Sequence, residues 1–273
     1  MAFATTSHNI DIKMGQQVMY YIPEENKHEV LKLKNLIKKL SWGIEYSDFL
    51  SPFAIKYAVE VLLKNQNHIL HRSWGGYEGS ERNILALFSS DFEEYTENLT
   101  YPIQTILIEA KNNLSHRQIL GSLIGNGLKR DKIGDILVKE NSALVFVKDE
   151  IATYITTNID KIGREKVKCS LVENNQVDIK WFISDTGKRV VYTVASLRAD
   201  SVISHGFGIS REEAAELIRQ MKVAVNWVYI DKPSYYVKEG DLISVRHHGR
   251  LKIEKVLSTT KKGRISIEVL RFS

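Results

Sequence analysis

Residues 196–246 read SLRADSVISHGFGISREEAAELIRQMKVAVNWVYIDKPSYYVKEGDLISVR, and this stretch decides the fold of the last third of the chain. Its first half predicts two short helices. The first is capped by Ser196 and ends within 205–208, because glycine accepts the left-handed conformation at a helix C-terminus. The second begins with a capping box over 210–213. The second half alternates apolar and polar residues around a turn at 239–241, which predicts strands joined as a hairpin.

The second of these helices carries its charges on separate faces. At about 100° per residue, its apolar residues share one sector and its acidic residues another. The third sector is basic and holds Arg211, Arg219 and Lys222. Burial of the apolar sector therefore fixes the direction in which these cations point.

Positive charge is concentrated in the same part of the chain. The 273 residues carry a formal charge of +5. Residues 1–187 hold 22 Lys and Arg against 24 Asp and Glu, whereas residues 188–273 hold 16 against 9. This asymmetry favours a polyanionic partner, with nucleic acid the commonest, although a solvated basic surface is the alternative.

Composition excludes several other classes of protein. Hydrophobic residues make up 43% of the chain and charged residues 26%, as in globular proteins. No apolar run approaches the ~18–20 residues of a membrane span, and residues 1–13 lack the layout of a secretion signal. Cys169 is the single cysteine, so an internal disulfide and a thiolate metal cluster are excluded. We therefore expect a soluble, cytoplasmic protein without a metal or cofactor and without a membrane partner.

Upstream of residue 183, the pattern predicts a mixture of helices and short strands. Helices are predicted at 24–40, from 52, at 115–125 and at 149–159, and strands at 68–70, 84–88, 103–108, 136–138, 143–147 and 166–172. This order is typical of the α+β class. The restarts of the pattern and the shifts in composition divide the chain into three domains at 1–90, 91–182 and 183–273.

Several stretches carry a resemblance to known proteins. The stretch 196–246 resembles the alpha-L RNA-binding motif of small-subunit ribosomal protein S-four. GGYEGSER at 75–82, LSHRQILGSLIGNGLKRDKIGDILV at 114–138 and VASLRADSVIS at 194–204 are similar to the bacterial YlmH family. The resemblance covers essentially the whole chain. It implies an N-terminal α/β domain, a central ferredoxin- or RRM-like RNA-binding domain, and a C-terminal S-four-like domain that ends in a β-hairpin.

The resemblance also implies a function. Members of this family are non-enzymatic RNA-binding proteins, so a monomer is expected that binds ribosomal RNA or tRNA on the large ribosomal subunit and acts in ribosome-associated quality control or translation. The motif places the RNA face on Arg198, Ser210, Arg211, Arg219, Lys222, Asn226 and Arg246. These residue types fit, because cations and helix N-termini contact phosphates. The alternative is an ordinary charged helix edge, with Asn226 satisfying a turn.

Two residues depart from the motif. Met221 stands where the motif usually has glycine, and a left-handed conformation costs a non-glycine residue roughly 1 kcal/mol. A different helix exit would move Lys222. Trp227 replaces the usual glycine after Asn226, although tryptophan fits the YlmH subgroup.

A second group of basic residues precedes the C-terminal third. His116, Arg117, Lys129, Arg130 and Lys132 bracket the predicted helix at 115–125 and the loop after it. They form either a second RNA contact or a solvated surface. The glycine-rich loop 75–82 could cradle a phosphate, but it lacks the spacing of nucleotide-binding loops, which favours a plain connection between strands.

Two other functions remain open at this point. The same RNA-binding motif occurs in RNA-modifying enzymes, although the chain shows no Arg-Leu-Asp catalytic stretch of a pseudouridine synthase and no glycine-rich cofactor loop after a strand. Leu197-Arg198-Ala199-Asp200 has a different order and lies inside the motif. An adaptor protein linked to cell division is the other possibility, and it would need an exposed apolar face.

Overall fold

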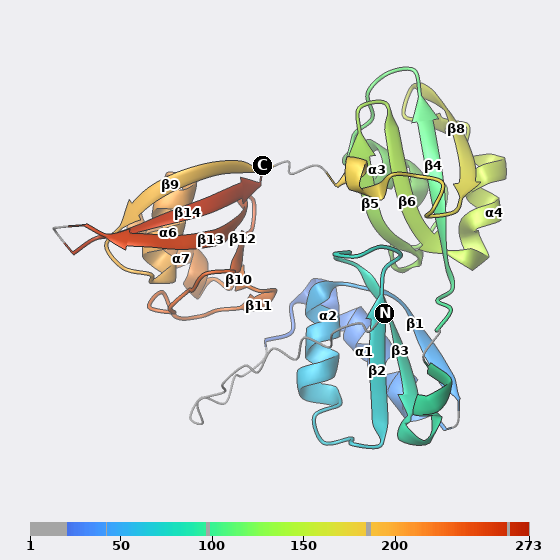
Figure 1. Cartoon of the computed structure of the whole chain (residues 1–273), viewed down its shortest axis with the longest axis horizontal. Helices are drawn as coiled ribbons and strands as arrows, with labels where there is room; N and C mark the ends of the chain where they lie inside the picture. Colours follow the sequence, from blue (N-terminus) through green and yellow to red (C-terminus); the bar gives the residue numbers. More distant parts are fainter. Residues whose placement is uncertain (1–20, 42, 97–98, 184–186, 261–262, 273) are drawn as a thin grey trace.

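The computed structural model describes residues 21–41, 43–96, 99–183, 187–260 and 263–272, and it arranges them around three β-sheets. Each sheet has its own helices, so the α+β class is confirmed (Figure 1). The expectation about residues 1–13 lies outside the described residues.

The first sheet is three-stranded and antiparallel, in the order β1-β3-β2. Its strands are β1 (Ile44–Leu50), β2 (Ile69–Trp74) and β3 (Asn83–Ser89). The helices α1 (Glu24–Lys39) and α2 (Pro52–Tyr57) pack against it, as the sequence predicts, through a core that includes Leu33, Leu50 and Leu87. The Ser51 hydroxyl accepts a hydrogen bond from the Ala54 amide, which confirms the predicted cap. Strand β1 was not predicted.

The central sheet has the topology of a ferredoxin- or RRM-like domain. In chain order the main elements are β4 (Ile103–Ala110), α3 (His116–Gly125), β5 (Ile133–Lys139), β6 (Ser142–Lys148), α4 (Asp149–Asn158) and β8 (Glu165–Val172). The short β7 (Lys161–Ile162) extends the sheet, whose order is β5-β6-β4-β8-β7. Ser115 and Gln118 form the predicted capping box of α3. The predicted helices and strands of this region are confirmed.

The helices α3 and α4 cover only one face of the central sheet. Ile106, Ile108 and Val145 point toward them and are fully buried. The opposite face is covered in part by the first domain. Tyr77, from the loop between β2 and β3, lies against Phe146 of β6 with ring centroids 4.8 Å apart, and Phe49 of β1 belongs to the same buried cluster. Phe182, from the short helix α5 (Ile179–Phe182), completes this cover.

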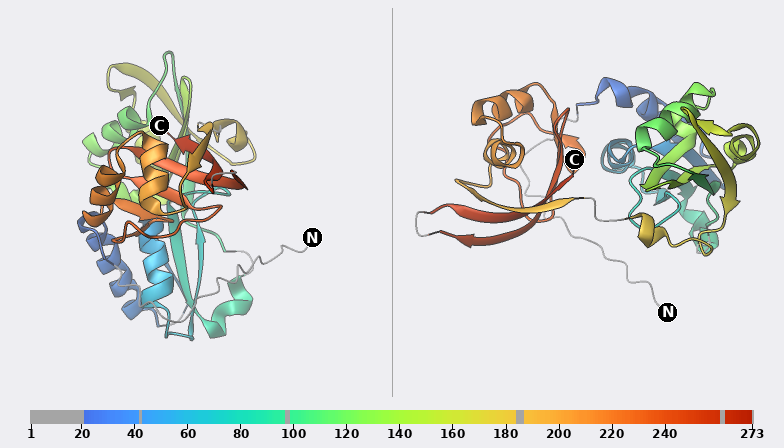
Figure 2. Two further views of the ribbon diagram at one scale, coloured as in Figure 1. Left: turned by 90° about the vertical axis from the view of Figure 1, so that its left-hand side faces the viewer. Right: turned by 90° about the horizontal axis from the view of Figure 1, so that it is seen from above.

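The third sheet is six-stranded, in the order β11-β10-β12-β13-β14-β9. Its strands are β9 (Lys188–Val194), β10 (Val223–Val225), β11 (Val228–Tyr229), β12 (Leu242–Val245), β13 (Gly249–Thr259) and β14 (Ile265–Phe272). The helices α6 (Ala199–Phe207) and α7 (Arg211–Arg219) pack together and lie on one side of the long strands (Figure 2, orange and red). Strand β9, which pairs with β14, was not predicted.

One local prediction in this domain needs correction. Ser196 does not cap α6, whose N-cap position is held by Arg198 without a side-chain cap hydrogen bond. The helix starts later because the Ala199 and Asp200 amides donate to Tyr235 and Pro233 carbonyls, which a sequence pattern does not show. The predicted end is confirmed, since Gly208 is left-handed with φ of +70°.

A carboxylate joins the first domain to the second. Asp135 of β5 accepts hydrogen bonds from the Tyr77 hydroxyl at 2.8 Å, the Glu81 amide at 2.7 Å and the Arg82 amide at 3.0 Å. The loop 75–82 therefore does bind an anion, but the anion is a side chain of the same protein. Gly76 is required in this loop, because its φ is +105° and a Cβ there would lie 2.4 Å from the Phe146 ring.

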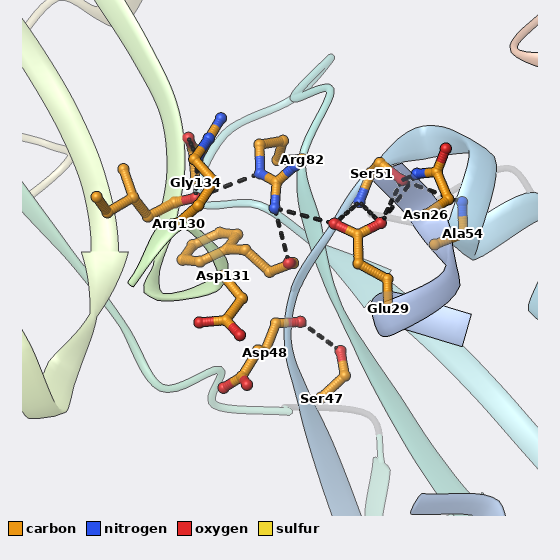
Figure 3. A network of polar contacts seen from close by, with 12 residues as sticks. Asn26, Glu29, Ser47, Asp48, Ser51, Ala54, Arg82, Arg130, Asp131 and Gly134 are labelled. Carbon is orange, nitrogen blue, oxygen red and sulfur yellow. Dashed lines mark hydrogen bonds and ion pairs between the residues drawn. The ribbon is translucent and has the colours of Figure 1, made fainter. Parts of the chain in front are cut away.

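Arg82 continues this junction (Figure 3). Its guanidinium donates to the Phe49 carbonyl at 2.9 Å and to Glu29 at 3.3 Å, and Glu29 in turn accepts from the Ser51 amide and hydroxyl. Lys32 and Lys132 both pair with Asp48, and Lys32 also pairs with Asp131. Partly buried arginine and lysine contacts of this kind are specific in geometry, so they fix how the first two domains meet.

We predict that Asp135→Asn lowers the free energy of unfolding by about 1–3 kcal/mol, because an amide has fewer acceptor positions for the three donors and lacks the negative charge. Chemical denaturation measures this loss. The matched control is Asp91→Asn, at an exposed carboxylate with no ion pair among the described residues, which should change stability by less than about 0.5 kcal/mol. Equal effects of the two substitutions would contradict the role given to Asp135.

Candidate RNA interface

Arg198 and Arg211 converge on one buried carboxylate. The Arg198 guanidinium donates to both oxygens of Asp200, at 3.2 and 2.8 Å, and Arg211 Nη2 donates to Oδ1 at 3.3 Å. The Asp200 side chain is only 5% exposed, whereas those of Arg198 and Arg211 are 34% and 52% exposed. Each guanidinium is thus held in place from inside and presents its remaining donors to the solvent.

The starts of two helices bring these side chains together. Arg198 holds the N-cap position of α6, and Asp200 lies in its first turn, where the helix dipole favours a negative charge. Arg211 is the first residue of α7, directly after Ser210. The Ser210 hydroxyl accepts from the Glu213 amide at 3.0 Å, which confirms the cap. Of the predicted capping box only this half is formed among the described residues, since Glu213 does not return a bond.

The charge state of Asp200 follows from its neighbours. Burial by itself raises the pKa of a carboxyl group, but the hydrogen bonds and charges of Arg198 and Arg211 outweigh it and hold the Asp200 pKa below its ordinary value of 3.8. The carboxylate is therefore ionised at neutral pH. Two arginines and one aspartate leave a net positive charge, aimed outward by a buried anion.

The remaining predicted cations gather at the other end of α7. Arg219, in its last turn, pairs with Glu216 at 3.2 Å on the exposed surface. Lys222 follows the helix, and its carbonyl accepts from the Arg246 amide at 2.9 Å, so Lys222 and Arg246 are neighbours. The structure therefore divides the predicted RNA face into two groups, one at Asp200 and one around Lys222.

The chain leaves α7 as it would with glycine. Met221 is left-handed, with φ of +55°, and the Lys222 amide still bonds to the Leu217 carbonyl at 3.0 Å. Asn226 and Trp227 also have positive φ, of +48° and +65°, which is the geometry of a type I′ turn between β10 and β11. Three non-glycine residues are thus held in a conformation that each would ordinarily avoid.

The Asn226 side chain is occupied inside the protein. Its Nδ2 donates to Asp241 at 2.9 Å, and its Oδ1 accepts from the Leu242 amide at 3.0 Å. Trp227 packs against a cluster of the first domain that contains Phe53 and Tyr57. These contacts favour the turn-stabilising role of Asn226 over base recognition, and they place its hairpin against the first domain.

The second predicted RNA contact does not form a single surface. Arg130 turns inward and donates to the Ile133 and Gly134 carbonyls, and burial together with the nearby Arg82 lowers its pKa to about 10. Lys132 pairs with Asp48 and Glu150. His116, Arg117 and Lys129 lie at the surface. The imidazole of His116 is nevertheless partly shielded from water, and this desolvation, together with the Arg130 charge, lowers the His116 pKa. Arg130 and Lys132 thus belong to the junction between domains.

Two residues near the Arg198 site were not singled out from the sequence. Asp200 organises the arginines, and its signal was available, because an acidic residue two positions after an arginine at a helix start is a natural partner. Tyr236 is 69% exposed and forms a β-bridge with Arg198 through the backbone. That contact joins residues 38 positions apart, so no local pattern indicates it.

Comparisons with known proteins identify two of the domains and a relative that matches most of the chain. Residues 89–176 match the family model described as "Putative RNA-binding domain in YlmH", and residues 197–243 match the model of the S4 domain. "Ribosome-associated protein quality control protein P2" of Bacillus subtilis is 30% identical over 248 residues, which are 86% of this chain and 90% of that protein. The small ribosomal subunit protein uS4 of Pseudothermotoga lettingae is 40% identical over 67 residues, 24% of this chain and 32% of its own.

A solved structure, "Cell division protein ylmH from Streptococcus pneumoniae", is also similar, with 22% identity and a TM-score of 0.48. It covers 58% of this chain and 98% of that one. The two matched family models define an RNA-binding protein with an S4 domain. From the extent of the Bacillus match, the chain belongs to the YlmH family, that of ribosome-associated protein quality control protein P2.

Clusters of metal ligands and membrane-spanning helices are both absent from the residues that the structure describes. Within residues 21–41, 43–96, 99–183, 187–260 and 263–272, the side chains of His, Cys, Asp and Glu nowhere form a group of three that could hold a metal ion. Over the same ranges, every helix is too short or too polar to cross a bilayer.

The Cys169 thiol donates to the Ile159 carbonyl, and burial raises its pKa to about 11.

We predict that Asp200→Asn lowers the melting temperature at pH 7, since the amide cannot accept the same charge-assisted bonds. The free energy of unfolding should fall by about 1–3 kcal/mol. A depressed folded-state pKa means that the stabilisation is complete above the ordinary pKa and is lost as the pH falls through the folded value. The difference between the two proteins should therefore shrink only below pH 3.8. A constant difference between pH 7 and pH 3 would contradict this ion pair.

We predict that Met221→Gly raises the free energy of unfolding by up to about 1 kcal/mol, because glycine adopts positive φ without the steric cost. Met221→Ala serves as the control, since alanine also removes the side chain but keeps the cost. The glycine variant should be the more stable of the two in chemical denaturation, and the reverse order would show that position 221 is unstrained.

Proposed function

We propose that this protein binds structured RNA, ribosomal RNA or tRNA, on the large ribosomal subunit and acts in ribosome-associated quality control. The observation that carries the proposal is the pair Arg198 and Arg211, held half-exposed on the buried Asp200 at the starts of two helices. A guanidinium that is already fixed loses less conformational entropy when it contacts a phosphate. The relative in Bacillus subtilis is named for ribosome-associated quality control, which supports the setting.

The proposal includes the finer expectations from the sequence. The protein acts in the cytoplasm, as a monomer, and without catalysing a reaction. Its RNA face comprises the Asp200 group together with Arg219, Lys222 and Arg246, with Ser210 at the helix start. The domains 1–90, 91–182 and 183–273 are proposed as its folding units, and limited proteolysis tests their boundaries. Modified nucleosides in RNA incubated with the protein and a methyl donor would favour the enzymatic alternative.

We predict that Arg211→Glu weakens co-sedimentation with purified large ribosomal subunits by tenfold or more, because it removes a fixed phosphate contact and leaves Asp200 with one partner. The matched control is Lys255→Glu on β13, with the same charge change at an exposed lysine of the same domain that has no ion pair among the described residues. Because the Lys255 ammonium is mobile and hydrated, this substitution should weaken co-sedimentation about threefold or less.

Thermal melts must first show that both variants are folded. Arg198→Glu should resemble Arg211→Glu, because both side chains share Asp200. Binding of the unaltered protein should also weaken as salt rises, with a log–log slope of about −0.7 to −0.9 per neutralised phosphate. If folded Arg211 and Lys255 variants lose equal affinity, the overall positive field binds the subunit and the proposed face is wrong.

A further inference from the structure

The open face of the central sheet divides into a covered part and a free part. In an antiparallel sheet, residues directly opposite one another point to the same face. Phe146 of β6 stands opposite Thr105 of β4, and Leu144 opposite Leu107. Tyr77, Phe49 and Phe182 bury this region, so the part of the sheet on which an RRM stacks its bases is closed here by the protein itself.

The next row along the same face is polar and at least partly exposed. It crosses four strands in register: Lys139 of β5, Ser142 of β6, Glu109 of β4 and Lys168 of β8. Lys166 lies two residues before Lys168 and therefore on the same face, and it stands opposite Lys161 of β7. Lys161, Lys166 and Lys168 are exposed. We call Lys139, Lys161, Lys166 and Lys168 the lysine strip.

The charges of the lysine strip do not stabilise the folded protein. Lys161 and Lys166 form a like-charged cross-strand pair, which is destabilising. Lys161, Lys166 and Lys168 have no ion pair among the described residues, although Glu109 stands opposite Lys168. The hairpin nevertheless holds its shape, because Ile162 of β7 is only 1% exposed and Val167 packs on the same core. The backbone positions of these lysines are thus fixed, while their ammonium groups have no ion pair among the described residues, which indicates a surface kept for an anion.

An exposed tryptophan stands at one end of the strip. Trp181 of α5 is 45% exposed, and the Lys139 ammonium lies 5.7 Å from its ring centroid. Phe182 packs edge-on against the tryptophan, with centroids 4.8 Å apart, and anchors α5 in the buried cluster. An aromatic ring beside a row of cations is the arrangement that binds single-stranded nucleic acid, with bases stacked on the ring and phosphates on the cations.

We propose that the lysine strip and Trp181 form a second RNA site, which takes a single-stranded segment: the phosphates lie along Lys139, Lys168, Lys166 and Lys161, and a base stacks on Trp181. This proposal rests on the RNA-binding function proposed above and adds a surface on another domain. It replaces the group of His116, Arg117, Lys129, Arg130 and Lys132, which the structure divides. A duplex fits this site poorly, because its bases are not free to stack on the ring.

The test measures binding of the full chain to a fluorescein-labelled 12-nucleotide oligouridine by anisotropy. Lys166→Gln/Lys168→Gln should weaken binding about 20-fold at 0.1 M salt and reduce the log–log salt slope by about 1.4, since single strands lose about 0.7 per phosphate contact. The matched control is Lys34→Gln/Lys38→Gln, two exposed lysines of α1 with the same charge change. In this control, the oligouridine affinity and the log–log salt slope should both stay within twofold of the values of the unaltered protein.

Two further variants separate stacking from charge. Trp181→Ala should weaken binding about fivefold or more without changing the salt slope, and Trp181→Phe should restore most of the loss. Glu109→Gln should tighten binding, because it removes the one carboxylate from the row. A 12-base-pair RNA duplex should bind more weakly than the oligouridine and should not distinguish Trp181→Ala from the unaltered protein.

The outcomes also separate this site from the arginine site. Equal effects of the strip and control variants, or no oligouridine binding by the unaltered protein, would overturn the strip even where Arg211→Glu abolishes subunit binding. Conversely, selective loss of oligouridine binding in the strip variant, with Arg211→Glu still bound to the large subunit, would support the strip and reject the proposed face of the C-terminal domain.

Discussion

The contact between Asp135 and the loop 75–82 decides how the first two domains share their surfaces. Three donors from that loop converge on one carboxylate, and the loop thereby carries Tyr77 onto Phe146. The apolar sheet face is thus buried by side chains of the same chain, with no need for an external partner. What the central sheet offers to RNA is then limited to the rows that Tyr77 does not reach.

A second carboxylate does comparable work in the third domain. Asp200 is nearly as inaccessible as the core, yet both of its oxygens are engaged by arginines that reach the surface. A buried charge without such partners would be expensive, so the arginines are required for the fold as well as available for a ligand. This double role explains why the site can be stiff: movement of either guanidinium away from Asp200 would leave a buried acceptor short of donors.

Much of the fold could be predicted from local patterns. Capping residues such as Ser51 and Ser115 and the left-handed Gly208 act within a few residues, and the structure confirms them. The strands β1 and β9 could not be found in this way, because they are defined by pairing with β3 and β14, which lie far away in the sequence. The late start of α6 likewise depends on carbonyls of residues 233 and 235.

The candidate site could be predicted in composition but not in grouping. The helix sector correctly predicts that Arg211 lies at the surface. Arg198 lies beside it because both arginines bind Asp200. Lys132 does not belong to a basic surface, because it pairs with Asp48 of another domain. Charge counting along the chain cannot separate these cases, since each cation contributes equally to the sum. What distinguishes one cation from another is the carboxylate that it pairs with, and tertiary structure determines this pairing.

The strained turn at Asn226 and Trp227 shows how the domains constrain one another. Glycine would relieve the positive φ at position 227, but it would also remove the ring that packs against Phe53 and Tyr57 of the first domain. Partial burial of the ring offsets the roughly 1–2 kcal/mol of a left-handed residue. A tryptophan is therefore tolerated where an isolated S4 domain uses glycine, because in this chain the hairpin is a contact with the first domain. The Asn226 side chain is meanwhile held by Asp241 and the Leu242 amide. The arginines on Asp200, the cations around Lys222 and the lysines of the central sheet are therefore the groups that we propose to meet RNA.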